Sequence, residues 1–136
     1  MTLEKTFINP PDIRAPFGEY HHGVVITQPT REKWLITSGQ LGIGKYDAIP
    51  KSTEDQTRLC FNSLHSLLAA AGMDFSDVVK ITAYVTDRND FPTYMAVRDE
   101  YTGDTSPTST LLIVSGFTRP EFKVEVEIIA VRASDA

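Results

Sequence analysis

The sequence predicts a single α+β domain in which two helices cover one face of a mixed sheet. Two segments carry apolar residues at helical spacing behind polar capping residues. Other segments are short and rich in β-branched residues, and the clearest of them alternate apolar and polar positions. The segments follow the order β-β-α-β-α-β-β, and placing both helices on one face buries their apolar sides most simply. The 136 residues have the size of one domain, which we assign to residues 1–136.

The N-terminal part of the chain is expected to be extended and then to form a hairpin. Several prolines within the first twenty residues favour a strand or an arm over a helix. Residues 23–27 and 34–38 are predicted strands of an antiparallel hairpin, joined by the polar turn 29–33. Residues 39–44 are rich in glycine but lack the Lys-Ser/Thr pair of a phosphate-binding loop, so we interpret them as a mobile loop.

A first helix is predicted to begin at Ser52 or Thr53 and to end before Gly72. Ser and Thr hydroxyls suit the N-cap position, and acidic residues follow in the first turn, where they interact favourably with the helix dipole. Gly72 is expected to take the left-handed backbone conformation that ends many helices. The apolar stripe comprises Phe61, Leu64, Leu68 and Ala71, and is widened by Cys60 and Leu67. The single cysteine is therefore expected in the core.

The clearest predicted strand covers residues 78–87. Its expected core-facing residues are Val79, Ile81, Ala83 and Val85, and its other face carries Lys80, Thr82, Tyr84 and Thr86. A second helix follows from Asn89 or Asp90 to about Thr102, because Pro92 is tolerated in the first turn of a helix.

Residues 109–114 and 123–132 are predicted strands that complete the sheet. In the last strand, one face carries Val124, Val126, Ile128 and Ala130, and the other carries Glu125, Glu127, Ile129 and Val131. The second set shares a face of the sheet with Lys80, Thr82 and Tyr84. This face is too apolar at its ends to be left in water and too charged to form the core of a single chain. An interface between copies of the chain that encloses a polar cleft would explain both properties.

The composition restricts the possible partners and location. The formal net charge is −5 and no run of basic residues occurs, whereas nucleic-acid binding relies on clustered Lys and Arg, so no nucleic-acid partner is expected. One cysteine allows no internal disulfide, and no apolar stretch is long enough for a membrane span, so we expect a cytoplasmic protein without a membrane partner. His21 and His22 are adjacent and point apart, and only His65 lies elsewhere, so no metal site is expected.

Several strings, in the same order and along nearly the whole chain, resemble the reactive intermediate deaminase (Rid, or YjgF) family. They are residues 36–40 (ITSGQ), 77–87 (DVVKITAYVTD), 89–91 (NDF), 106–107 (SP), and 119–121 (RPE) leading into 124–131 (VEVEIIAV). The resemblance implies a chorismate-mutase-like fold and a homotrimer whose sheets pack inward and leave three clefts between subunits. It also implies hydrolysis of reactive enamines and imines to an oxo acid and ammonia, without a cofactor or metal.

Carried over residue by residue, the resemblance assigns the catalytic carboxylate to Glu125, which would orient or activate a water molecule. Tyr20 is assigned to the pocket wall, and Ser38 and Gly39 to the hairpin loop beside the substrate. The family's deaminases grip the substrate carboxylate with an arginine two residues after the proline of the SP string. This chain has Ser109 at that position.

A second position expected to contact the substrate also differs from the family pattern, because Met95 stands where the second helix usually carries asparagine. Arg98, Arg119 and Lys80 are candidates to replace the missing arginine. Each also has a structural interpretation: Arg98 as a solvated helix residue, Arg119 as part of a structural loop, and Lys80 as an ion-pair partner of Glu127.

The sequence leaves two principal functions open. The first is hydrolysis of an imine, enamine or related C–N metabolite other than 2-aminoacrylate, with Glu125 as the catalytic residue and Ser109, Met95 and Arg98 contacting the substrate. The alternative is a non-catalytic homotrimer that binds a metabolite in the same cleft. Ribonuclease activity is disfavoured by the acidic charge. Ser109 has no evident base that would make it a nucleophile.

Overall fold

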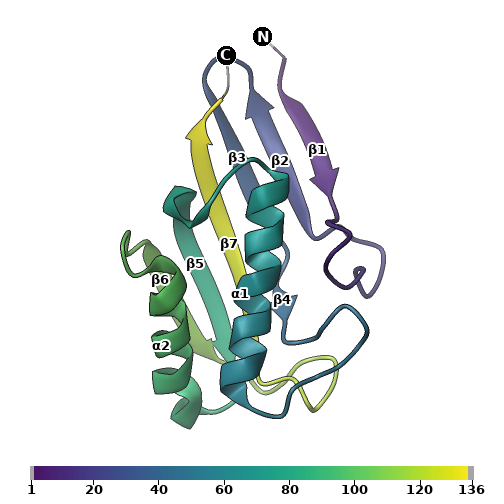
Figure 1. Ribbon diagram of the computed structural model, residues 1–136, viewed down its shortest axis with the longest axis vertical. Helices are drawn as coiled ribbons and strands as arrows, with labels where there is room; N and C mark the ends of the chain where they lie inside the picture. Colours follow the sequence, from purple (N-terminus) through teal and green to yellow (C-terminus); the bar gives the residue numbers. More distant parts are fainter. Residues whose placement is uncertain (1, 135–136) are drawn as a thin grey trace.

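The computed structural model describes residues 2–134 and confirms the predicted α+β architecture. Within these residues a seven-stranded mixed sheet is covered on one face by two helices, α1 (Thr53–Ala70) and α2 (Phe91–Thr102) (Figure 1). The strands are β1 (Glu4–Ile8), β2 (Gly23–Gln28), β3 (Glu32–Thr37), β4 (Gln40–Leu41), β5 (Val78–Val85), β6 (Thr108–Ile113) and β7 (Val124–Ala133). No helix in this part of the chain is long and apolar enough to cross a membrane.

The C-terminal strand occupies the middle of the sheet. The strands are ordered β1-β2-β3-β7-β5-β6, and β4 pairs separately with β7. All pairs are antiparallel except β5 and β6, which are parallel and are connected through α2. The two edges of the sheet are therefore β1 and β6. We call the face that the helices do not cover the open face, and the residues of β7 that point away from the helices lie at its centre.

Residues 39–44 are not the mobile loop that their glycine content suggested. Two of these residues form β4 by pairing with β7. Gly42 lies so close to α1 that a Cβ atom there would be 2.4 Å from the Cβ of Gln56. The segment is thus fixed between the sheet and the helix, and its glycine permits close packing rather than motion.

One residue of the predicted core face of β5 points the other way. Val79 is 40% exposed, whereas Val78 is buried. The pairing register between β5 and β7 shifts between Val78 and Lys80, and the irregularity breaks the alternation of faces at that point. The remaining residues of the predicted core face are buried: Ile81, Ala83 and Val85.

Helix α1 begins and ends where the sequence predicts. The Oγ of Ser52 accepts a hydrogen bond from the backbone N–H of Asp55 (3.1 Å), so Ser52 is the N-cap. Gly72 follows the helix with a φ of 71°, in the left-handed region. Cys60 is fully buried in the stripe, which confirms it as a core residue, and this burial raises the pKa of its thiol.

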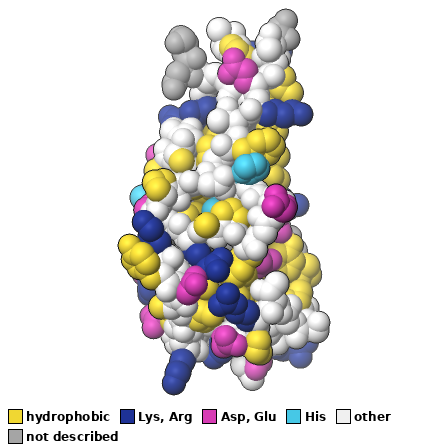
Figure 2. Space-filling model, turned by 90° about the vertical axis from the view of Figure 1, so that its right-hand side faces the viewer, with side chains coloured by type: hydrophobic (Ala, Val, Ile, Leu, Met, Phe, Trp, Pro, Cys, Tyr) yellow, Lys and Arg dark blue, Asp and Glu magenta, His cyan; other side chains and the backbone are white. Residues whose placement is uncertain are grey.

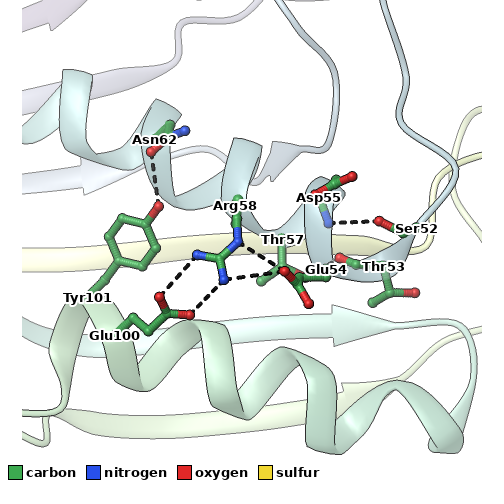
Figure 3. Close-up of polar contacts among 9 residues, drawn as sticks. All are labelled: Ser52, Thr53, Glu54, Asp55, Thr57, Arg58, Asn62, Glu100 and Tyr101. Atoms are coloured by element: carbon green, nitrogen blue, oxygen red, sulfur yellow. Dashed lines mark hydrogen bonds and ion pairs between the residues drawn. The ribbon is translucent and has the colours of Figure 1, made fainter.

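Polar contacts join α1 to α2 on their solvent side (Figure 3). Arg58 of α1 donates to both carboxylate oxygens of Glu100 of α2, at 2.8 and 3.2 Å, and also contacts Glu54 one turn earlier. Tyr101 Oη donates to Asn62 Oδ1 at 3.0 Å. Because these contacts are exposed to water, they orient the two helices more than they stabilise the fold.

Gln56 is a fully buried polar residue of α1 that holds two loops. Its Nε2 donates to the carbonyl oxygens of Pro50 (2.8 Å) and Glu121 (2.9 Å), and its Oε1 accepts from the backbone N–H of Lys123 (2.9 Å). Both ends of the side-chain amide are therefore bonded. The segment before β7, residues 114–123, is positioned by these bonds.

Candidate functional site

A cavity lies between the N-terminal segment, β4 and the start of β7. Its volume is about 170 Å³, and it is partly open to solvent. Its walls include Arg14, Phe17, Tyr20, His22, Gly39 and Glu125. Three of the residues that the family resemblance assigned to the site (Tyr20, Gly39 and Glu125) therefore meet here.

Glu125 contributes the only carboxylate among the described residues that line this cavity. Its side chain points away from the helices, because its neighbours Val124 and Val126 are buried beneath them. Within residues 2–134 its carboxylate forms no hydrogen bond or ion pair. Burial raises the pKa of Glu125, and the nearby charge of Glu127 raises it further. A carboxyl group with these properties is suited to exchange a proton with a substrate or water.

Gly39 provides the space that the Glu125 carboxyl group occupies. A Cβ atom at residue 39 would lie 2.5 Å from Cδ of Glu125. Among the described glycines only Gly72 has a positive φ, so the backbone conformation does not require glycine at residue 39. The requirement is steric, since any side chain there would displace the carboxyl group.

The N-terminal segment brings Tyr20 to the cavity. Tyr20 Oη accepts a hydrogen bond from the backbone N–H of Phe17 (3.1 Å), and the backbone N–H of Tyr20 donates to the carbonyl of Gly18 (2.9 Å). These bonds fold residues 17–20 into a tight turn. Because Tyr20 Oη is the acceptor in its bond, the hydroxyl hydrogen remains available to a ligand.

Ser38 supports the site by holding the backbone. Its Oγ donates to the carbonyl of His21 (2.8 Å), and its own carbonyl accepts from Gln40 Nε2 (3.1 Å). Gln40 Nε2 also donates to Nδ1 of His22 (3.2 Å), and His22 Nε2 donates to the carbonyl of Arg14 (2.6 Å). The chain of hydrogen bonds fixes the N-terminal segment against β4.

Arg98 and Ser109 form a second group, at another cavity of about 230 Å³ between α2 and β6. Arg98 Nη1 donates to Ser109 Oγ at 3.4 Å, and the Nε and Nη2 atoms contact Asp99 at 3.0 and 2.9 Å. Only 22% of the Arg98 side chain is exposed, so the interpretation of a solvated helix arginine does not describe it. Met95 lies about one helical turn before Arg98 and is exposed.

The sheet separates these two groups within one chain. Ser109 pairs with Ile81, which is buried on the helix-covered face, so Ser109 points toward that face. Glu125 points toward the open face. Moreover, β6 and β7 flank β5, which places them about 10 Å apart at the usual strand spacing. A single chain therefore does not bring Ser109, Met95 or Arg98 next to Glu125.

Lys80 and Arg119 have different surroundings. Tyr84 Oη donates to Glu127 Oε1 (2.6 Å), a bond that raises the pKa of Tyr84 to about 12. Lys80 forms no ion pair with Glu127 among the described residues, so that predicted pairing is wrong. Arg119 adjoins the Glu125 cavity, with its guanidinium carbon 5.4 Å from the centre of the Phe17 ring.

Arg14, Phe17 and His22 are among the wall residues that were not predicted from the sequence. No motif marks them, and His22 was considered only as a metal ligand. The sequence did contain one signal, which is that these residues lie close to Tyr20 in the chain. When one residue of an extended segment lines a pocket, its neighbours in the same segment often line it too. Within the described residues, no three His, Cys, Asp or Glu side chains are grouped to hold a metal ion.

Comparison with known proteins identifies the family. Residues 12–132 match the endoribonuclease L-PSP family. TdcF of Escherichia coli K12 is 32% identical over 127 residues, covering 89% of this chain and 94% of TdcF. The crystal structure of E. coli TdcF with bound serine matches with a TM-score of 0.82 at 29% identity, covering 94% of this chain and 99% of that one. The 2-iminobutanoate/2-iminopropanoate deaminase of E. coli K12 is 31% identical over 122 residues, covering 87% and 91% of the two chains. The chain therefore belongs to the endoribonuclease L-PSP family, in which its relatives include imine deaminases.

Proposed function

We propose that this protein hydrolyses a small imine or enamine to the corresponding oxo compound and ammonia. The observation that carries the proposal is Glu125, a partly buried carboxyl group without an ion-pair partner among the described residues, at the cavity beside Tyr20 and Gly39. The E. coli relative named for 2-iminobutanoate and 2-iminopropanoate supports this reaction class. The substrate is expected to differ from 2-aminoacrylate, because Ser109 stands where the deaminases of the family carry arginine.

In this reaction the imine carbon is the electrophile and water is the nucleophile. Glu125 accepts a proton from the attacking water while the water oxygen bonds to the imine carbon, and it passes this proton to the imine nitrogen, which gives a neutral carbinolamine. Glu125 then accepts the proton of the carbinolamine hydroxyl and delivers it to the nitrogen as the C=O bond forms, the C–N bond breaks and ammonia leaves. The raised pKa of Glu125 makes its carboxylate a stronger base than an ordinary glutamate, and it can return the proton to the leaving nitrogen.

The site is proposed to be completed by a neighbouring copy in a homotrimer whose sheets pack inward. The open face of the sheet supports this assembly, because Trp34 and Ile36 are each 40% exposed there. The separation of the two groups supports it as well. Ser109 and Arg98 cannot reach the Glu125 of their own chain, whereas the β6 edge of an adjacent subunit could bring the same residues to its cavity.

A non-catalytic homotrimer that binds a metabolite is the alternative. Ser109 and Met95 favour this alternative, because they stand where the family's deaminases carry arginine and asparagine. The hydroxyl of Ser109 carries no positive charge, and the thioether of Met95 offers no amide group to orient a substrate. A binding protein would need the cavity and Tyr20 but would not need proton transfer by Glu125.

Release of ammonia and oxo acid from enzymatically generated imines tests the proposal. The panel contains 2-iminobutanoate, 2-iminopropanoate and an imine without a carboxylate, each incubated with the wild type and with Ser109→Arg. We expect the wild type to exceed the spontaneous rate on at least one imine other than 2-iminopropanoate, which is the imine tautomer of 2-aminoacrylate, and the preferred imine to show whether a carboxylate is recognised. Turnover only in Ser109→Arg would show that the wild-type site lacks a group that binds the substrate carboxylate. No turnover by either protein would contradict the hydrolase and favour the binding protein.

A further inference from the structure

The guanidinium groups of Arg14 and Arg119 both lie over the ring of Phe17, at the edge of the Glu125 cavity. The guanidinium carbon of Arg14 is 3.9 Å from the ring centre, and that of Arg119 is 5.4 Å from it. Arg14, Phe17 and Thr118, the residue before Arg119, line the same cavity as Glu125. Two cations from distant parts of the sequence therefore converge at one aromatic wall.

Arg119 is presented by a loop whose position is fixed. The backbone N–H of Phe122 donates to the Arg119 carbonyl (3.2 Å), and the buried Phe122 ring packs edge-on against Phe17, with 6.2 Å between ring centres. The bonds from Gln56 hold the same loop from the side of α1. The backbone that carries Arg119 is thus positioned before any ligand binds, so less entropy is lost in ordering the loop on binding.

The two guanidinium groups differ in their counter-ions. Arg14 forms an ion pair with Asp47. Arg119 has neither a carboxylate within ion-pair distance nor a side-chain hydrogen bond anywhere in residues 2–134, although it is half-buried. Figure 2 shows the side of the molecule that lies at the right of Figure 1, where Lys and Arg side chains lie among hydrophobic and acidic ones in the lower half. A half-buried guanidinium with unused N–H groups is stabilised when it binds an anion.

We infer that Arg119 forms a carboxylate-binding site at the mouth of the Glu125 cavity, with Phe17 as its apolar wall. The planar guanidinium can donate two parallel N–H bonds to a carboxylate. The rest of a small ligand then extends into the cavity toward Glu125. That this ligand is an imino acid rests on the proposed function, whereas the anion site itself does not.

The other two candidate cations are less suited to this role. Arg98 already contacts Asp99 through Nε and Nη2, and it lies on the side of the sheet opposite to Glu125. Lys80 lines a separate small cavity on the open face together with Glu127. Arg119 is the candidate that combines unused donors with a place beside the wall of the Glu125 cavity.

Binding of 2-oxobutanoate, the product of 2-iminobutanoate hydrolysis, to the full-length protein tests the site by isothermal titration calorimetry. Arg119→Met keeps an unbranched side chain over Phe17 and removes the charge, and Arg119→Lys keeps the charge. Arg31→Met, in the exposed turn between β2 and β3, is the matched control. We expect Arg119→Met to weaken binding by about 10- to 100-fold, as for a lost hydrogen bond to a charged group. Arg119→Lys should recover part of the affinity, and Arg31→Met should bind as the wild type does.

Equal affinities of the wild type and Arg119→Met, or no saturable binding to the wild type, would overturn the inference. Equal losses in Arg119→Met and Arg119→Lys would overturn it too, because they would show that packing rather than charge matters. The outcomes separate the two proposals. If the wild type hydrolyses no imine but its binding depends on the charge at residue 119, the anion site stands and the proposed function fails. If hydrolysis depends on Glu125 but binding does not depend on residue 119, the inferred anion site is wrong and the proposed function stands.

Discussion

Replacing Glu125 by glutamine is expected to slow imine hydrolysis by about 10²- to 10⁴-fold, the usual contribution of a general acid–base group. The amide has the shape of the carboxyl group and fits beside Gly39, but it cannot accept a proton from the attacking water. The folded protein should be at least as stable at neutral pH as the wild type. Burial and Glu127 raise the pKa of Glu125, so the ionised form lowers stability above that pKa, and the neutral amide removes this cost. Measurements of kcat/KM and of denaturant unfolding check the two effects.

The pH dependence of the same pair of proteins gives a second check. In the wild type, the rate should rise with pH as Glu125 ionises, at a pKa above the ordinary range of glutamate, and Glu125→Gln should lack this rise. The effect on stability has the opposite sign: the contribution of the raised pKa is complete below the unfolded-state pKa and is lost as pH rises through the folded-state pKa.

Glu127→Gln is the matched control, because Glu127 lies on the same sheet face but is bonded to Tyr84. Removing its charge should move the acid limb of the rate profile to lower pH without abolishing turnover. A wild-type rate in Glu125→Gln would contradict the catalytic role of that carboxyl group. An equal loss in both variants would show that the charge of the face matters, and not Glu125 itself.

Replacing Gln56 by leucine is expected to lower the free energy of unfolding by about 2–4 kcal/mol, because several backbone groups lose their partner at once. The substitution keeps an apolar stem of similar size in the core. It leaves the carbonyl groups of Pro50 and Glu121 and the N–H of Lys123 without the hydrogen bonds that Gln56 provides. Denaturant unfolding measures the change. Because the same bonds hold the loop of Arg119, binding of 2-oxobutanoate should weaken as well.

Thr57→Val is the control for this substitution. Thr57 is the next residue of α1 and is also fully buried, but its hydroxyl donates only to the carbonyl of Thr53 in the same helix (2.7 Å). We expect it to cost about 1 kcal/mol or less, since one neutral hydrogen bond is lost and no loop is released. If the two variants were equally stable, the positioning of residues 114–123 by Gln56 would be contradicted.

Much of the fold could be predicted because its signals are local. The N-cap at Ser52, the left-handed Gly72 and the alternation of β7 are each encoded within a few residues, and all three are confirmed. The errors arose where distant segments meet. The register shift that exposes Val79 depends on the pairing of β5 with β7, and the fixed place of Gly42 depends on its contact with α1.

The candidate site could likewise be predicted only where its signals are local. The family resemblance identified Glu125 and Gly39 separately, but only the folded chain shows that the glycine gives the carboxyl group its space. Phe17 could not be found from any motif, because its importance comes from two arginines that reach it from other segments. Ser109 was grouped with Glu125 by resemblance, and Arg98 was a candidate to replace the missing arginine. The structure of one chain places both on the other side of the sheet from Glu125.

Molar mass in solution, measured by light scattering at micromolar concentration, tests most directly whether a neighbouring copy completes the Glu125 site. A homotrimer predicts a single species with three times the 15.1 kDa mass of one chain. A monodisperse species with the mass of one chain would contradict it. The exposed apolar residues of the open face, Trp34 and Ile36, would then have no partner, and Ser109 and Arg98 would have no means of reaching Glu125.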